Sequence, residues 1–229
     1  MSVDERMVHD IVQKVMANMQ ISGSVSGMHG VFKDMNDAIN ASIEAQKKVC
    51  TMTLDQREQI ISLIRKKTHE NAEILANMGV NETGMGNVGD KILKHHLTAD
   101  KVPGTEDIST IAWSGDRGLT LVEMGPFGVI GAITPATNPS ETVICNCIGM
   151  LAGGNTVVFN PHPNAKKTTI YTINMINEAS IEAGGPDNIA VTVEAPTLDT
   201  SAIMMKHPSI HLLVATGGPG VVTAVLSSG

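Results

Sequence analysis

The sequence predicts an α/β protein, in which a doubly wound parallel sheet follows a helical N-terminal segment. From about Leu119, short runs rich in β-branched residues alternate with helical stretches, which is the order of successive β–α units. The runs are apolar almost throughout, as in strands that helices cover on both faces. The expected pairs of strand and helix are 128–133 with 141–151, 156–159 with 166–183, 189–193 with 198–205, and 211–215 with a helix from about 220.

The residues before this sheet divide into three parts. Residues 1–21 predict one short amphipathic helix, and residues 22–27, mostly Ser and Gly, predict a flexible linker. Residues 28–115 are expected to be helical, which leaves 116–229 as the α/β domain. The apolar stripe of the first helix consists of Val8, Ile11, Val12, Val15, Met16 and Met19.

Spacing and capping signals place the helices within residues 28–115. Thr53, with Gln56 three residues later, forms a capping box that opens one helix, and Pro103-Gly104 ends the last one. The expected core-facing positions are Phe32, Met35, Ile39 and Ile43, then Ile60, Ile61, Ile64, Leu75 and Met78, then Ile92, Leu93 and Leu97. Farther along, glycine pairs at 153–154 and 184–185 fall where helix C-caps belong.

Composition argues against several classes of function. A net charge of −7 and a content of one Trp, one Tyr and three Phe argue against nucleic-acid binding. No apolar run approaches the length that spans a membrane. Three cysteines give no disulfide framework, so a reducing cytoplasm is expected, with Cys145 and Cys147 packed in the core. The pair His95-His96 has no acidic or sulfur companion at ligand spacing, so no metal site is expected.

Two glycine-rich segments resemble nucleotide-binding loops, and only the second has the right context. Residues 84–89 spell G-x-G-x-x-G but follow a helix, so we expect a loop between helices rather than a phosphate site. Thr216-Gly217-Gly218-Pro219-Gly220 follows an apolar strand and opens a helix with Pro219 near its first position. Such a loop favours an anion at the helix N-terminus, although a tight turn without a ligand fits the same residues.

Ligands of doubly wound sheets bind beyond the carboxyl ends of the strands, so the loops at those ends are the candidate sites. The loop at 134–139 carries two prolines and Asn138, and Ser140 could cap the next helix. The Asn138 amide could donate to a developing oxyanion, or the residue could serve only the turn. The next strand ends in Asn160-Pro161-His162-Pro163, where His162 could contact a ribose or phosphate, or could be an exposed loop histidine.

These motifs together resemble the aldehyde dehydrogenase superfamily. Residues 126–139 resemble the strand and loop that end in its oxyanion asparagine, and residues 154–161 resemble the following strand. Most members have a lysine where this chain has Asn160. This departure, together with the Asn-Pro-His-Pro sequence, resembles the coenzyme-A-acylating branch. Further matches to that branch, close to acetaldehyde and propionaldehyde dehydrogenases of bacterial microcompartments, are Glu82-Thr83-Gly84-Met85-Gly86, Asp90-Lys91 and Pro103-Gly104-Thr105-Glu106-Asp107.

The resemblance implies a Rossmann-like NAD-binding domain and a reaction in which an aldehyde, coenzyme A and NAD yield an acyl-coenzyme A and NADH. Asn138 would stabilise the oxyanion, and NAD and coenzyme A would bind in turn in overlapping space. The implied cofactor groove consists of Ile133, Thr134, Pro135, Asn160, His162, Thr216, Gly217 and Gly218, with Ala195 and Pro196 near the adenine. The family's nucleophilic cysteine lies beyond residue 229, in a second domain, so this chain alone is expected to be inactive.

The family also implies partners. Residues 1–21 resemble the encapsulation peptides that bind microcompartment shell proteins, although the helix could instead pack on its own domain. We therefore expect a cytoplasmic enzyme, housed in a microcompartment and homo-oligomeric in its complete form. Two alternatives stay open at this point. One is a fragment of a non-acylating NAD-dependent semialdehyde dehydrogenase, and the other is a nucleotide-binding or cargo module without catalysis.

Overall fold

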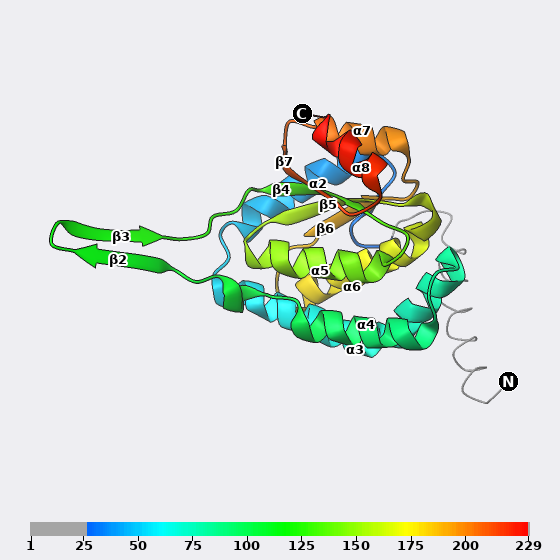
Figure 1. The fold of residues 1–229 in the computed structure, drawn as a ribbon, viewed down its shortest axis with the longest axis horizontal. Coiled ribbons are helices and arrows are strands. Elements are labelled where there is room, and N and C mark those ends of the chain that lie inside the picture. The colour runs from blue at the N-terminus through cyan, green and yellow to red at the C-terminus, as the bar shows by residue number, and fades with distance from the viewer. Residues whose placement is uncertain (1–26, 229) are drawn as a thin grey trace.

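The computed structural model describes residues 27–228, and its centre is a five-stranded sheet in the order β1-β6-β5-β4-β7. Every pairing in the sheet is parallel, so the predicted fold class is confirmed (Figure 1). The predicted helix at 1–21 and nearly all of the predicted linker lie outside the described residues. The strands are β1 (Val31–Phe32), β4 (Val129–Thr134), β5 (Thr156–Pro161), β6 (Ala190–Val193) and β7 (Ile210–Ala215).

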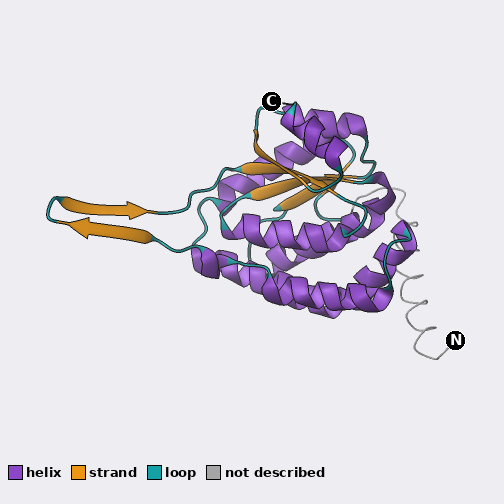
Figure 2. Cartoon of the chain, viewed as in Figure 1, coloured by secondary structure: helices purple, strands orange, loops and turns teal. Residues whose placement is uncertain are grey.

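Helices cover both faces of the sheet, as Figure 2 shows. On one face, α5 and α6 contact β5 and β6, and α3 and α4 form an outer layer behind them. On the other face, α2 contacts β5 and β6, α7 contacts β4, β5 and β7, and α8 packs beside β7. The helices are α2 (Met35–Val49), α3 (Leu54–Thr83), α4 (Val88–Lys101), α5 (Pro139–Ala152), α6 (Lys166–Glu182), α7 (Leu198–Lys206) and α8 (Pro219–Leu226), with short 3-10 turns at Thr105–Asp107 and Pro163–Ala165.

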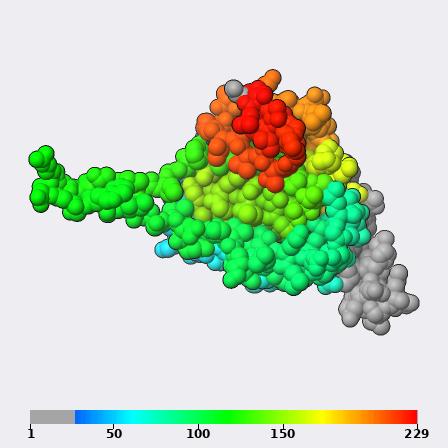
Figure 3. Space-filling model, in the orientation of Figure 1, coloured from blue at the N-terminus to red at the C-terminus, as the bar shows by residue number. Residues whose placement is uncertain are grey.

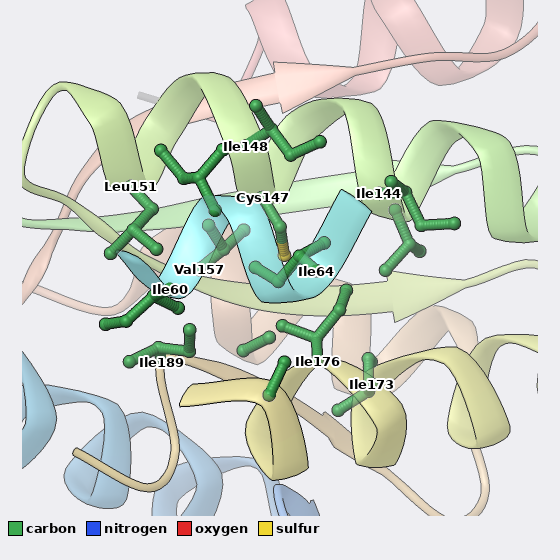
Figure 4. Packing of buried hydrophobic residues seen from close by; sticks show 14 of the residues in the cluster. Ile60, Ile64, Ile144, Cys147, Ile148, Leu151, Val157, Ile173, Ile176 and Ile189 are labelled. Atoms are coloured by element: carbon green, nitrogen blue, oxygen red, sulfur yellow. The ribbon is translucent and has the colours of Figure 1, made fainter. Parts of the chain in front are cut away.

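The alternation of side chains along β5 divides the core into two clusters. Val157 and Phe159 point to the face covered by α5 and α6, whereas Val158 points to the face covered by α2. The first cluster, shown in Figure 4, brings together isoleucines from α3, α5 and α6 around Cys147. Cys147 is therefore in the core as predicted, but Cys145 is exposed, because residues two apart on a helix point to different sides.

Local signals fixed several helix ends correctly. Thr53 and Gln56 form the predicted reciprocal capping box at the start of α3. Gly84 ends α3 in the left-handed conformation, at φ 67°, and Asn87 caps α4 by accepting a hydrogen bond from the N–H of Asp90. The G-x-G-x-x-G sequence is thus the end of one helix and the start of the next, which confirms the expectation of a loop between helices.

The predicted core-facing stripe of α4 is wrong. Leu93 and Leu97 are 67% and 59% exposed, whereas Lys91, His95 and Ala99 face inward. The reason is the surface that α4 packs against. The N-terminal turn of α5 and the polar loop before it offer carbonyl, hydroxyl and carboxylate groups, and these require polar partners when they are buried.

Two strand regions lie in or beside residues that were expected to be helical. β1 adds an edge to the sheet through Val31 and Phe32, so Phe32 belongs to a strand rather than to the stripe of α2. β2 (Ile111–Gly115) and β3 (Gly118–Val122) form an antiparallel hairpin that projects from the body, and all ten of its strand residues are exposed (Figures 1 and 3).

Candidate functional site

A cavity of about 450 Å³ lies at the carboxyl ends of β4, β5 and β7, between these strands and the helices α7 and α8. This is the edge of the sheet at which doubly wound proteins bind their ligands. Predicted groove residues that line the cavity are Ile133, Thr134, Pro135, Asn160, His162, Thr216, Gly217 and Gly218. Ala195, Pro196 and Asn138 are not among its lining residues.

The helical walls of the cavity were not predicted. Thr197, Leu198, Ser201 and Met205 line it from α7 and its cap, and Val221 and Ala224 line it from α8. The strand-end rule identifies the floor of such a site but not the helix faces that enclose it. The position of Thr197 and Leu198, directly after Ala195-Pro196, was the available signal in the sequence.

Thr134 at the end of β4 has a buried hydroxyl without a partner. The residue is 2% exposed and lines the cavity, yet its Oγ1 makes no hydrogen bond within the described part of the chain. Most buried hydroxyls in folded proteins are hydrogen-bonded, because leaving one unpaired costs free energy. A polar group of a ligand in the cavity would supply the missing partner.

The second glycine loop has the geometry expected of an anion-binding turn. The N–H of Thr216 donates to the carbonyl of Ile133 at 3.0 Å, which ties the loop to the end of β4. α8 begins at Pro219 with Gly218 as its cap residue, and no side chain caps it. The start of α8 therefore meets the cavity without a side chain in front of it, which suits an anionic group.

Asn160 lies at the cavity, but the protein itself uses its amide. Nδ2 donates to the hydroxyl of Ser201 at 2.6 Å and to the carbonyl of Thr197 at 3.3 Å. Oδ1 accepts a hydrogen bond of 2.7 Å from the hydroxyl of Thr200. With Asn160 only 4% exposed, these bonds join β5 to the first turn of α7. Asn160 thus shapes the wall of the cavity.

His162 is an exposed loop residue that also lines the cavity, so its contact with a ribose or phosphate stays a prediction. Its Nδ1 accepts a hydrogen bond of 3.1 Å from the N–H of Asn164. A neutral ring whose Nδ1 accepts carries its proton on Nε2. His162 can therefore donate from Nε2 to an oxygen atom at the rim of the cavity.

Asn138 is the cap residue of α5 but does not cap it. Its side chain makes no cap hydrogen bond, and its Oδ1 instead accepts from the Nζ of Lys94 at 3.3 Å. The expected cap at Ser140 is wrong as well, because α5 begins one residue earlier, at Pro139. The Ser140 hydroxyl lies inside the helix and meets His95 Nε2 at 2.7 Å.

Charged groups are buried beneath the loop that carries Asn138. Lys91 and Glu141 are 3% and 7% exposed, and Lys91 Nζ donates to Glu141 Oε1 at 3.4 Å and to the carbonyl of Thr137 at 3.0 Å. His95 is fully buried beside them, and burial is the main reason that its pKa lies below the ordinary value of 6.5. The spacing of Lys91, His95 and Ala99 on one helical face was the signal in the sequence.

The described residues hold neither a metal-binding cluster nor a membrane-spanning helix. Between residues 27 and 228, no three His, Cys, Asp or Glu side chains are grouped so that they could hold a metal ion. None of the helices in this part of the chain is both long enough and apolar enough to cross a membrane.

The parallel sheet, the helices on both faces and the cavity at the strand ends define a doubly wound α/β protein of the Rossmann type. Comparison with known proteins identifies the family. Residues 17–229 match the model of the aldehyde dehydrogenase family, and the chain belongs to that family.

The similar proteins include acylating aldehyde dehydrogenases. An acetaldehyde dehydrogenase (acetylating) from Bilophila wadsworthia is 46% identical over 95% of this chain and 46% of its own length. A propionaldehyde dehydrogenase structure from the fucose utilisation microcompartment of Clostridium phytofermentans is 73% identical, with a TM-score of 0.87 over 88% of this chain and 46% of its own. A Rhodopseudomonas palustris propionaldehyde dehydrogenase with bound propionyl-CoA is 48% identical, with a TM-score of 0.85 over 87% of this chain and 45% of its own. The chain thus spans a little under half the length of these relatives.

Proposed function

We propose that this chain is the NAD-binding part of a coenzyme-A-acylating aldehyde dehydrogenase, and that the cavity at the strand ends holds the nucleotide. The unpartnered Thr134 hydroxyl carries the proposal, because it offers a ligand a hydrogen bond inside a cavity whose surface is mainly apolar. The acylating relatives and the propionyl-CoA bound to one of them support the same assignment.

The residues of the cavity fit a dinucleotide or coenzyme A. Apolar side chains such as Ile133, Leu198 and Val221 provide surfaces for an adenine ring. The glycine loop at 216–218 lets the backbone approach a phosphate at the start of α8. When bound, the nicotinamide supplies the acceptor for a hydride. NAD and coenzyme A would occupy this cavity in turn.

We propose a two-stage reaction for the complete enzyme, in which the aldehyde is first oxidised and its acyl group is then transferred to coenzyme A. A cysteine thiolate would add to the aldehyde carbon, and NAD, when bound, would accept the hydride of the resulting hemithioacetal while a proton goes to solvent, which would leave a thioester. The sulfur of coenzyme A then attacks the thioester and releases the cysteine, which gives an acyl-coenzyme A and NADH. Asn138 would donate from its amide to the oxyanion that forms when sulfur adds to the carbonyl.

The cysteines of this chain do not suit the role of nucleophile. The thiolate is the reactive form, and full burial raises the pKa of the Cys147 thiol. Cys145 is exposed as a residue, but partial desolvation of its sulfur by the surrounding protein raises the pKa of that thiol too. Cys50 is the C-cap residue of α2, and its sulfur accepts a hydrogen bond from Nε2 of Gln46. We therefore expect the purified chain to form no NADH from an aldehyde and NAD, with or without coenzyme A. NADH formation that a Cys145→Ser substitution abolishes would overturn this expectation.

A thermal-shift titration with NAD, NADP and coenzyme A tests the binding site, because a ligand that binds only the folded form raises the unfolding temperature. Thr134→Val keeps the shape of the side chain and removes a hydroxyl that has no internal partner. This variant should be as stable as the parent chain but bind the nucleotide more weakly, by about 0.5–1.5 kcal/mol.

Thr192→Val is the matched control. The Thr192 hydroxyl donates to the carbonyl of Phe159 at 3.0 Å, and the residue does not line the cavity. This variant should lose stability and keep its affinity. If none of the three ligands stabilises the parent chain, the proposed function is wrong. If Thr134→Val responds to the ligands as the parent does, the position of the ligand is wrong.

We also propose that the complete enzyme is a homo-oligomer that acts in the cytoplasm inside a bacterial microcompartment, with residues 1–21 binding a shell protein. The fucose utilisation microcompartment of the Clostridium relative supports this assignment. A fluorescent protein fused to residues 1–21 should enter a matching shell, and an Ile11→Glu, Val15→Glu version should not. Equal encapsulation of the two fusions would contradict the proposal.

A further inference from the structure

We infer that Lys94 is a positioning residue that orients the amide of Asn138 so that its NH₂ group, rather than its oxygen, faces away from α4 and serves as a donor. The inference rests on the proposed role of Asn138 in oxyanion stabilisation. An asparagine amide has an acceptor end and a donor end, and only the donor end stabilises a negative oxygen. The orientation of this amide therefore decides whether Asn138 can act.

The start of α5 leaves the Asn138 amide without its usual constraint. An asparagine at this position commonly accepts a hydrogen bond from the N–H two or three residues later, and that bond fixes its oxygen toward the helix. Asn138 makes no such bond, and its backbone, at φ −138° and ψ 67°, is outside the usual extended conformation of a cap. Some other group must hold the amide if its direction is fixed.

Lys94 supplies that constraint from the neighbouring helix. Its Nζ lies 3.3 Å from Asn138 Oδ1, and an ammonium group can only donate, so the oxygen end of the amide is turned toward α4. Within the described residues, Nδ2 of Asn138 makes no hydrogen bond. The cation also draws electron density toward Oδ1, which makes the N–H groups better donors to an oxyanion.

Lys91 fixes the same loop one residue earlier. Lys91 and Lys94 are three apart on α4, so they lie on the same side of the helix. Lys91 Nζ donates to the carbonyl of Thr137 and to the buried carboxylate of Glu141, while Lys94 reaches the side chain of Asn138. Helix α4 thus holds the backbone before the asparagine and its amide oxygen, which leaves the NH₂ group as the part that a substrate can meet.

The experiment uses the 229-residue chain with ¹⁵N-labelled asparagine. The side-chain NH₂ signals of Asn138 are assigned by their loss in Asn138→Asp. Lys94→Met should move these two signals toward the values of an exposed, unrestrained asparagine and lower their heteronuclear NOE, because the side chain is then free to rotate about its Cβ–Cγ bond. Lys94→Arg keeps a donor at the same place and should restore the parent signals. Lys101→Met, at the exposed end of the same helix, is the control and should leave them unchanged.

Lys94 is exposed, so its variants should fold and unfold at the temperature of the parent chain. Asn138 signals that are unchanged in Lys94→Met would overturn the inference, as would an effect of equal size in Lys101→Met. NAD and coenzyme A are titrated in the same samples. Failure of both to bind the parent chain would count against the proposed function, whereas the Asn138 signals report on Lys94 in either case.

Discussion

The carboxyl ends of β4 and β5 are neighbours in the sheet, and an asparagine near each end is held in a different way. Asn160 is buried and bonded by neutral groups of α7, which use both ends of its amide. Asn138 instead contacts a charged residue of α4, since its amide accepts a hydrogen bond from Lys94, and this contact uses only the oxygen end of the amide. The first arrangement fixes a wall of the cavity, whereas the second leaves a donor available.

This difference shows that resemblance to a family's binding residue at one position does not by itself establish that the residue binds a ligand here. The resemblance assigned a functional role to both asparagines. The hydrogen-bond partners separate them, because a buried amide that is satisfied inside the protein has little left to offer a ligand. The two kinds of support also predict different responses to mutation and to pH.

The largest effect should come from the charged support. Lys91→Met leaves the buried carboxylate of Glu141 without its cation, and breaking a buried ion pair in this way typically costs about 3–5 kcal/mol. Urea denaturation of the purified chain measures the change. Lys101→Met, at the exposed end of α4, should stay within about 0.5 kcal/mol of the parent. A loss below about 1 kcal/mol in Lys91→Met would show that the pair is not the support that its burial indicates.

The neutral support at β5 should give a smaller loss. Asn160→Ala leaves the hydroxyl groups of Thr200 and Ser201 without the amide that they contact, and unpaired buried groups cost about 1–3 kcal/mol. Asn164→Ala, on the exposed turn that follows β5, serves as the matched control and should be close to neutral. If the two variants unfold at the same urea concentration, the link between β5 and α7 contributes no stability.

The sequence was sufficient for β4, β5, β6 and β7 of the sheet and for the floor of the cavity. Four of its strands are apolar runs long enough to be identified, and the glycine loop after β7 has a clear signature. The strands and the glycine loop can be identified because each depends only on the order of residues within a short segment. β1 is only two residues long, so no period can be detected in it. The hairpin did carry a signal, since Ile111 and Trp113 alternate with smaller residues before the turn, as Leu119 and Leu121 do after it.

The support of the two asparagines could not be predicted, because it depends on packing between distant segments. Lys91 and Glu141 are 50 residues apart, and Asn160 and Ser201 are 41 apart. A lysine on a helix is usually exposed, so burial of Lys91 contradicts the ordinary expectation for its type. Because lysines are usually exposed, the sequence pattern predicted Leu93 and Leu97, rather than Lys91, on the inward face of α4.

The pH dependence of stability should differ between the two supports. Burial lowers the pKa of His95 below 6.5, so at pH values under 6.5 the unfolded chain binds a proton that the folded chain does not. The folded form therefore loses stability as the pH falls through this range, by at most about 1.4 kcal/mol per pH unit for one group.

His95→Gln removes that proton uptake, so the difference in stability between this variant and the parent should narrow from pH 7 to pH 5. The groups that act on His95 are Glu141, Lys91 and His96, and all are retained in the variant. The hydrogen bonds of Asn160 involve neutral groups, so Asn160→Ala serves as the comparison for His95→Gln. The loss caused by Asn160→Ala should be the same at both pH values, because its partners do not titrate there. A difference that stays constant for His95→Gln would show that His95 does not titrate with folding.

The smallest effect should come from Asn138 itself. An asparagine at the cap of a helix usually contributes about 1 kcal/mol through its side chain, and Ala in its place loses that contribution. Asn138 makes no cap hydrogen bond, and its side chain accepts a hydrogen bond from the exposed Lys94, so Asn138→Ala should change the free energy of unfolding by less than about 0.5 kcal/mol. Thr53→Ala removes a capping box that is present at α3, and should cost about 1 kcal/mol in the same assay. A loss in Asn138→Ala as large as that in Thr53→Ala would mean that the oxygen of the Asn138 amide caps α5. A cap bond of this kind, rather than Lys94, would then fix the direction of the amide, and the difference between the two supports would not hold.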